Sequence, residues 1–381
     1  MSAPEALHAV AALDTAIDPR STESARFVRQ AHRIVRDLLI ARPRRYWTDF
    51  LSTIAIAYGA FAVYIAAPWF SILQTTAFIV CGLATYRAVV FTHELTHRRE
   101  RSFSAFTFVW NLLCGVPLLM PSFLYGDHKR HHTHQAYGTW SDPEYILRSR
   151  RQRLRVAIFL LLPFIYPLFA SIRFLILTPL ALLSSRLNRF VWVVASSLYV
   201  MNESYRRDYD AAASAPSRWI QELACSAWAW LVTALVLADR VPASVLGQTY
   251  LVALLWIALN QVRTLVAHRY TNQPDSPVSY VDQLLDTNTF PCGKWLPELW
   301  APVGLRYHAL HHVLPMIPYH AMRDAHHRLM LRLPPDSPYH QTVRAGLWPV
   351  LTEILRRHQG AMPDSYIAVS ANLTAGRQGS R

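Results

Sequence analysis

The sequence predicts an all-α membrane protein in which four transmembrane helices form two hairpins. Of its 381 residues, 52% are hydrophobic and only 16% are charged, whereas about a quarter of a typical soluble domain is charged. A mean hydropathy of only +0.13 indicates that a large part of the chain also faces water. The net charge of +14 would suit a nucleic-acid binder. Such proteins seldom contain long uncharged apolar runs, so we expect no nucleic acid partner.

The transmembrane helices are predicted from uncharged apolar runs. The run from Phe50 to Tyr86 contains no Asp, Glu, Lys or Arg. About 20 apolar residues make one spanning helix, so this run predicts two spans, near 48–67 and 70–90, that turn at Pro68–Trp69. A second pair is predicted near 219–238 and 241–262, with its turn at 239–242. We expect both hairpins to lie in a lipid bilayer.

The segments outside these hairpins are more polar. Residues 1–20 predict a disordered lead without a signal peptide, because acidic side chains interrupt any apolar stretch there. Residues 21–47 predict an amphipathic interfacial helix, and the pattern suits a helix on the membrane surface and a packed surface helix equally. Its apolar face holds Phe27, Ala31 and Leu38, and arginines occupy the other face. Residues 48–360 then form the membrane domain, and 361–381 a disordered tail.

Basic residues are distributed unevenly along the chain. Arginines are frequent before the first span and again between His97 and Arg155, whereas the two presumed outer turns hold only Arg240. The positive-inside rule therefore places both termini and the region 93–155 in the cytoplasm.

Seventeen histidines are present, and many of them are clustered. The first cluster is HELTH, the second HKRHH and the third HALHH, and their histidines are His93, His97, His128, His131, His132, His308, His311 and His312. Residues three or four apart share one face of a helix, so each cluster can direct two imidazoles to one place. Eight histidines exceed the three ligands of a catalytic zinc and suit two metals. Imidazole alone does not distinguish iron, copper, zinc and nickel.

The clusters constrain the path of three other apolar stretches, 102–126, 156–185 and 190–201. The first lies between two histidine clusters that have to reach the same metals, so it cannot cross the bilayer once. We expect it to re-enter or to lie flat. The other two stretches must together cross an even number of times.

The three clusters, in this order around two hairpins, resemble the histidine boxes of the integral-membrane fatty acid desaturase superfamily. Over roughly residues 45–335 the flanking sequences, such as SDPEY at 141–145 and RTLVAHRY at 263–270, resemble its bacterial members. The resemblance implies a cytosolic helical cap that holds a non-haem di-iron site, hence two iron ions as cofactors, and an acyl tunnel. It also implies that His268 is a ninth ligand, and it favours a bacterial inner membrane.

Other side chains near the clusters are candidates for supporting roles. Acceptors for the imidazole N–H groups are expected among Glu94, Asp127, Asp142 and Glu144. His134 extends the second cluster. Thr264 stands where the acyl-CoA branch of the superfamily has an asparagine that holds a metal-bound water, which argues against that branch.

The resemblance implies O2-dependent desaturation of a fatty acyl chain. The electrons would come from an external donor such as ferredoxin or a similar small carrier, because the chain has neither a haem-binding HPGG motif nor an iron–sulfur pattern. Hydroxylation, or oxidative decarboxylation to a terminal alkene, is the alternative on the same scaffold. HELTH also fits the HExxH motif of a membrane zinc metalloprotease. A non-catalytic metal transporter is the third alternative.

Overall fold

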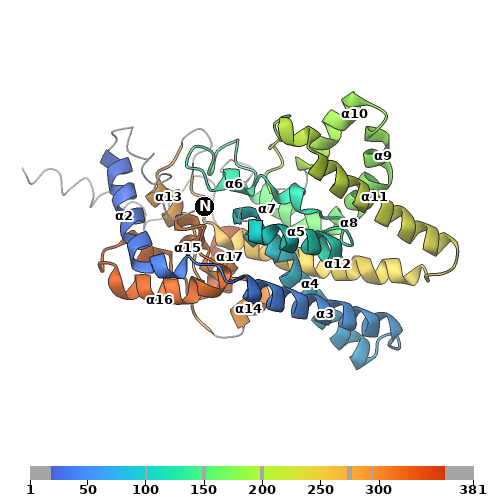
Figure 1. Ribbon diagram of the computed structural model, residues 1–381. Coiled ribbons are helices and arrows are strands. Elements are labelled where there is room, and N and C mark those ends of the chain that lie inside the picture. The colour runs from blue at the N-terminus through green and yellow to red at the C-terminus, as the bar shows by residue number, and fades with distance from the viewer. Residues whose placement is uncertain are drawn as a thin grey trace, which may run out of the picture.

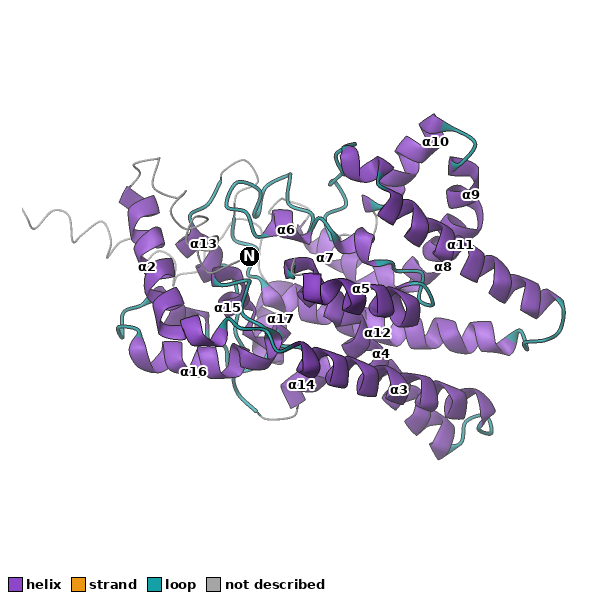
Figure 2. Cartoon of the chain, in the orientation of Figure 1, coloured by secondary structure: helices purple, strands orange, loops and turns teal. Residues whose placement is uncertain are grey.

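The computed structural model describes residues 19–98, 101–147, 152–197, 201–272, 277–293 and 296–356, and the regular elements there are helices. Figure 2 shows this helical architecture. The β-type pairing in the described residues is limited to two isolated bridges, His268 with Thr287 and Thr289 with Val343. The all-α fold class is therefore confirmed. The predicted disordered lead, apart from its last two residues, and the predicted tail lie outside the described residues.

Four helices are long and apolar enough to cross a membrane, as predicted. They are α3 (Pro43–Ala66), α4 (Ile72–His97), α11 (Pro216–Leu237) and α12 (Ser244–Ala267). Pro43 and Pro216 open their helices, where proline's missing N–H is not needed. Short turns join α3 to α4 and α11 to α12, so the four form two hairpins that extend from the other helices toward the same side of the molecule (Figure 1).

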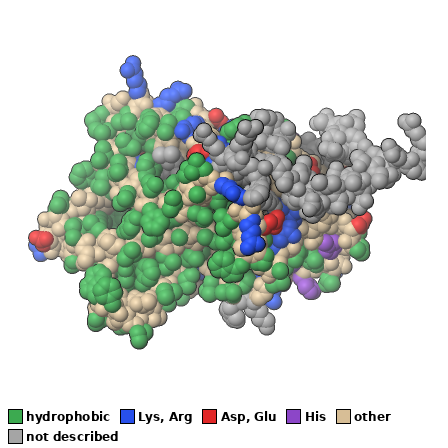
Figure 3. Space-filling view, turned by 180° about the vertical axis from the view of Figure 1, so that it is seen from behind, with side chains coloured by type: hydrophobic (Ala, Val, Ile, Leu, Met, Phe, Trp, Pro, Cys, Tyr) green, Lys and Arg blue, Asp and Glu red, His purple; other side chains and the backbone are tan. Residues whose placement is uncertain are grey.

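The surface of the hairpins is apolar. Within their most hydrophobic 18-residue windows, only 28% of α3 and 22% of α11 is buried inside the protein. Large side chains such as Phe70, Ile72 and Leu237 are almost fully exposed. Figure 3 shows hydrophobic side chains over the half of the molecule that the hairpins form and most of the visible charged side chains and histidines over the other half. Such a surface suits lipid, and the chain is an integral membrane protein.

The helices α4 and α12 are the most buried of the four and pack against each other. At Gly82 a Cβ atom would lie 2.4 Å from Leu255 Cδ2, so the glycine permits this close approach. The helix α5 (Ser104–Trp110) continues as the π-helix η3 (Asn111–Gly115) and lies beside α4, where Trp110 Nε1 donates to the Ala88 carbonyl (2.8 Å). At about 1.5 Å per residue this apolar helix is too short to span a bilayer.

The chain between residues 143 and 202 makes an excursion and returns to its starting point. The Asn202 amide donates to the Pro143 carbonyl (2.9 Å), and the Asn202 side chain donates to the Asp142 carbonyl (2.9 Å). The excursion is bent by 60° after Phe164. Its elements are α7 (Gln152–Leu161), η5 (Leu162–Phe164), α8 (Tyr166–Ile172), η6 (Arg173–Leu177), α9 (Thr178–Ala181), α10 (Ser185–Phe190) and η7 (Val191–Ala195). This return agrees with the expectation of an even number of crossings.

Helices at the other end of the molecule form a cap. They are α2 (Pro19–Val35), η1 (Arg36–Leu38), α13 (Tyr280–Leu285), α14 (Leu296–Trp300), η10 (Leu305–Tyr307), α15 (His308–Val313), η11 (Tyr319–Ala321), α16 (Met322–Arg332), η12 (Pro338–Thr342) and α17 (Leu347–Arg356). The apolar face of α2, with Phe27, Ala31 and Val35, is buried in one cluster with Leu310 and Leu329 of the cap. The helix expected over 21–47 is thus divided, because Pro43 begins α3.

A buried ion pair joins the excursion to the second hairpin. The Glu222 carboxylate on α11 is fully buried and accepts two bonds from Arg173 (both 2.8 Å) and one from Arg218 Nε (3.2 Å). Thr178 Oγ1 donates a further bond (2.9 Å). Two arginines therefore share one carboxylate in a region without solvent, and each depends on it for compensation of its charge.

We expect the substitution Glu222→Gln to destabilise the protein by about 3–5 kcal/mol, because it leaves two buried cations without a counter-charge. Thermal unfolding of the purified protein in detergent measures the effect. The matched control is Asp37→Asn, which removes the carboxylate of the exposed pair with Arg328 and is expected to change little, since solvent screens that pair. Equal stability of the two variants would contradict the assigned role of Glu222.

Candidate metal centre

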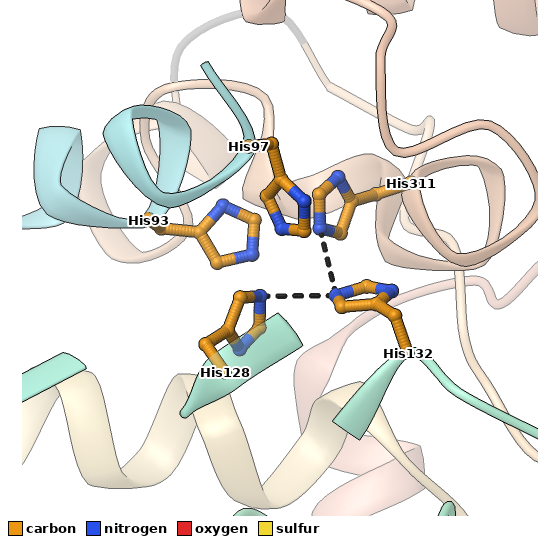
Figure 4. A group of neighbouring side chains, drawn as sticks. All are labelled: His93, His97, His128, His132 and His311. Atoms are coloured by element: carbon orange, nitrogen blue, oxygen red, sulfur yellow. Dashed lines mark hydrogen bonds between the residues drawn. The ribbon is translucent and has the colours of Figure 1, made fainter. Parts of the chain in front are cut away.

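One group of five histidines gathers where α4 enters the cap. His93 and His97 lie one turn apart at the end of α4. His128 begins the short helix α6 (His128–His131), His132 follows it, and His311 comes from α15. One ring nitrogen from each of the five lies within 4.8 Å of the others. Figure 4 shows the five rings directed toward a common centre.

A second group of four histidines lies beside the first. It consists of His131, His268, His308 and His312, again within 4.8 Å of one another. The His268 Nε2 atom lies 3.2 Å from that of His131 and 2.9 Å from that of His308, and His308 Nε2 lies 3.0 Å from His312 Nε2. His268 follows α12 in an extended conformation, which directs its ring away from the helix and into the group.

The two groups are built from the same elements. The second cluster contributes His128 and His132 to the group of five and His131 to the group of four. The third cluster contributes one histidine, His311, to the group of five and the other two to the group of four. The rings of His132 and His312 are 4.3 Å apart between centroids, so the groups are in direct contact. All nine histidines predicted as ligands therefore meet in one place, in sets of five and four.

The histidines fit metal ions. Burial lowers the pKa of His132, His268, His308, His311 and His312 well below the usual value, so these imidazoles are neutral and keep a lone pair. Both ring nitrogens of His93 and the Nε2 atom of His97 are buried without a hydrogen-bond partner among the described residues. Unpaired buried acceptors that converge in this way are costly, and cations placed between them would remove that cost.

Hydrogen bonds behind the rings set their orientation. Glu144 faces Nδ1 of His128 (2.9 Å), and both oxygens of Asp142 face Nδ1 of His131 (2.9 Å). A proton held on Nδ1 by such a carboxylate leaves Nε2 free as a ligand. Burial opposes the charge on Glu144, but the neighbouring His128 and His131 outweigh it and lower the pKa of that carboxyl to about 2. The carboxylates around His131, Asp142 foremost, overcome burial and raise the pKa of that imidazole.

Comparison with known proteins identifies the family. A model of the fatty acid desaturase family matches residues 68–343. This chain belongs to the fatty acid desaturase family. A curated relative, the ceramide hydroxylase of Caulobacter vibrioides (strain NA1000 / CB15N), is 39% identical over 336 residues, which cover 86% of this chain and 93% of the relative. Membership agrees with a di-metal centre, to which the family owes its chemistry.

Two of the four carboxylates expected beside the histidines lie elsewhere in this desaturase-family protein. Glu94 accepts from the Tyr46 hydroxyl (2.5 Å) and the Tyr319 amide (3.3 Å). Asp127 accepts from Arg207 Nε (2.8 Å) and the Tyr205 hydroxyl (3.0 Å). Both therefore connect neighbouring elements, while Asp142 and Glu144 contact the imidazoles.

Of the other two candidates, neither joins a histidine group. The His134 ring packs near Tyr280 (centroids 5.5 Å apart). Thr264 contributes its main-chain carbonyl, which accepts from the Tyr270 hydroxyl (3.1 Å). In the metalloprotease alternative, the glutamate of HExxH would have to reach metal-bound water. The geometry of Glu94 does not support that role, because its carboxylate is engaged with Tyr46 and Tyr319.

Sequence reasoning missed three side chains that support the second group. The Tyr137 hydroxyl lies 2.9 Å from His268 Nδ1 and donates to Asp286 (2.8 Å). Asp286 also accepts from Tyr145 (2.7 Å). The Gln283 amide lies 2.8 Å from His312 Nδ1. These residues lie outside the three clusters in the sequence, and no spacing rule connects them with the histidine groups that they support.

We expect Asp142→Asn to weaken metal binding about 10- to 100-fold, the usual effect of losing a carboxylate behind a ligand histidine. Asparagine keeps the shape and one acceptor oxygen but not the charge beside His131. Metal content per chain after dialysis against a graded series of chelator concentrations measures the change.

Glu94→Gln is the control for this experiment. Its carboxylate lies in the same cap region but contacts Tyr46 and Tyr319 instead of an imidazole, so its metal content is expected to stay at the wild-type level. Loss of metal from the Glu94 variant and retention in the Asp142 variant would reverse the roles assigned to the two carboxylates.

Proposed function

We propose that this protein is an O2-dependent, di-iron lipid hydroxylase that acts on a long-chain N-acyl lipid of the ceramide type. The observation that carries the proposal is the 39% identity with ceramide hydroxylase over 86% of the chain. The nine gathered histidines support it, since they offer a ligand set for two metal ions. We assign His93, His97, His128, His132 and His311 to one iron and His131, His268, His308 and His312 to the other.

The substrate bond explains the need for a metal. An unactivated alkyl C–H bond is too inert for any side chain acting as base or nucleophile, so a cofactor carries the difficult step. Two iron ions held by these histidines would allow O2 to be used as the oxidant: one oxygen atom would enter the C–H bond as a hydroxyl, and the other would leave as water with two protons and two external electrons.

The residues of the chain prepare the site for this chemistry. Neutral imidazoles bind the ions without adding negative charge. Asp142 and Glu144 hold two of the rings by their Nδ1 atoms, and Tyr137 does the same for His268. Most of the nine side chains are nearly inaccessible to solvent, which keeps bulk water away from the reacting carbon.

We propose that the electrons come from a separate small carrier such as ferredoxin. The four cysteines, Cys81, Cys114, Cys225 and Cys292, are free thiols far apart in the sequence, which supports an external donor. The arginine-rich segments at the cap end of the hairpins favour a cytoplasmic cap in a bacterial inner membrane. A basic surface there would also attract an acidic carrier.

Desaturation of an acyl chain is the second candidate, favoured by the family to which the chain belongs. It consumes the same O2 and the same two electrons. A second hydrogen is then removed from the neighbouring carbon, and both oxygen atoms leave as water. Hydroxylation and desaturation would use the same ligand set. Which of them occurs depends on how the acyl chain of the substrate lies beside the metals.

Lipid profiling of a host that expresses the protein with a suitable reductase system tests the proposal. We expect ceramides that have gained one oxygen atom, and we expect them to disappear in His311→Ala, because that histidine is a ligand in the first group. Lipids that have lost two hydrogens would instead establish desaturation. A terminal alkene one carbon shorter than its fatty acid would establish decarboxylation and refute the proposed hydroxylation.

A further inference from the structure

A buried arginine beside the metal centre lacks a counter-charge. Arg263 lies on α12, five residues before His268, and only 7% of its surface is exposed. Among the described residues no carboxylate lies within 4.0 Å of its guanidinium. The other buried arginines of the described chain each have one, namely Arg98, Arg173, Arg207, Arg218 and Arg306. Arg263 is thus the exception in this set.

The hydrogen bonds of Arg263 are also incomplete. One terminal nitrogen donates to Asn260 Oδ1 (2.7 Å), and this is the guanidinium's one hydrogen bond among the described residues. The Nε–H group is buried and has no acceptor among the described residues. A guanidinium has five N–H donors and no acceptor, so this side chain still requires an oxygen.

A second buried N–H group on the same face of α12 also lacks an acceptor. Trp256 is 5% exposed, and its Nε1–H group has no partner among the described residues. Seven residues separate it from Arg263, which is two helical turns, so both side chains leave α12 in the same direction. The two donors without acceptors therefore lie in one row that leads from the metal centre toward the middle of the hairpin.

Arg263 lies close to the metal centre along its own helix. It precedes His268 by five residues on α12, about 7.5 Å along the helix axis at about 1.5 Å per residue. Since α12 runs from the turn of its hairpin to His268, Arg263 lies on the hairpin side of that histidine.

A buried cation without a partner is costly, and an ionisable side chain inside a membrane segment generally has a function. We propose that Arg263 binds the acyl carbonyl oxygen of the lipid substrate and thereby holds the polar end of the lipid beside the metals. The oxidised carbon then lies a few bonds from the carbonyl group, whereas a mid-chain reaction would place only methylene groups there. This inference rests on the proposed function and adds to it the substrate group that is recognised.

An acyl carbonyl can belong to an amide or to a carboxylate, and three probes distinguish these sources. The first is a ceramide with a saturated acyl chain, the second is the corresponding free fatty acid, and the third is an ether-linked analogue of the ceramide that lacks the carbonyl. Binding of each radiolabelled probe to the purified, metal-loaded full-length protein is measured under nitrogen and without reductant, so that no turnover occurs.

We expect Arg263→Gln to weaken binding of the ceramide about 10- to 100-fold, the effect of losing a hydrogen bond from a charged donor. The ether analogue should bind the wild type and the variant equally and weakly. Arg263→Lys keeps the charge and should retain part of the affinity. The matched control is Arg218→Lys, another buried arginine that is paired with Glu222 away from the metals, and it should bind ceramide as the wild type does.

Metal content is measured on every variant, because a folded protein with both ions is the condition for the comparison. If Arg263→Gln does not fold, the comparison of ceramide with its ether analogue on the wild type decides instead. A folded Arg263→Gln variant with wild-type affinity, or a wild type that binds the ether analogue as tightly as the ceramide, would overturn the inference. If the fatty acid alone depends on Arg263, the carbonyl is that of a carboxylate.

The site of oxidation gives an independent readout. Fragmentation of the hydroxylated lipid should place the new oxygen near the carbonyl group in the wild type, and a mid-chain hydroxyl would refute the inference. Failure of the proposed function is a different result, in which the wild type makes no hydroxylated lipid although binding of the ceramide still depends on Arg263.

Discussion

The convergence of nine imidazoles in a buried space is the constraint on which the rest of this structure depends. Their Nε2 atoms approach to about 3 Å in several pairs, and uncharged rings with lone pairs directed at one another do not attract. Only cations between them, or protons that burial disfavours, make the arrangement stable. The fold therefore has to bring α4, α6, α12 and α15 to one point and keep that point dry.

The hairpin architecture meets this requirement. A hairpin leaves the cap and returns to it, so the end of α4 and the end of α12 both reach the cap with their histidines. The short helix α5 with η3 stays beside α4 and does not cross, and the excursion from 143 to 202 closes on itself through Asn202. Each connection thus preserves the side on which the ligands meet, while the close contact at Gly82 holds α4 against α12.

The parts of this fold that could be predicted are those with a local signal. An uncharged run of about 20 residues is sufficient to predict a span, and histidines three or four apart predict a shared helix face. Contacts between distant segments have no such signal. Glu94 adjoins His93 in sequence, but one residue rotates a helix by about 100°, which carries its carboxylate to Tyr46. Tyr137, Asp286 and Gln283 were missed because only the tertiary fold brings them to the histidines.

The same distinction applies to the reaction itself. Desaturation and hydroxylation would use the same nine histidines, so these residues do not determine which carbon reacts. The outcome then depends on the side chains that face the substrate beside the metals. A wall made only of apolar side chains accepts methylene groups from any part of a chain, whereas a buried guanidinium favours a lipid that brings an oxygen to it. The family resemblance drew attention to Thr264, yet the side chain with a buried donor that lacks an acceptor is its neighbour Arg263. In this protein the position of one uncompensated charge, more than the metal centre, would select the substrate atom.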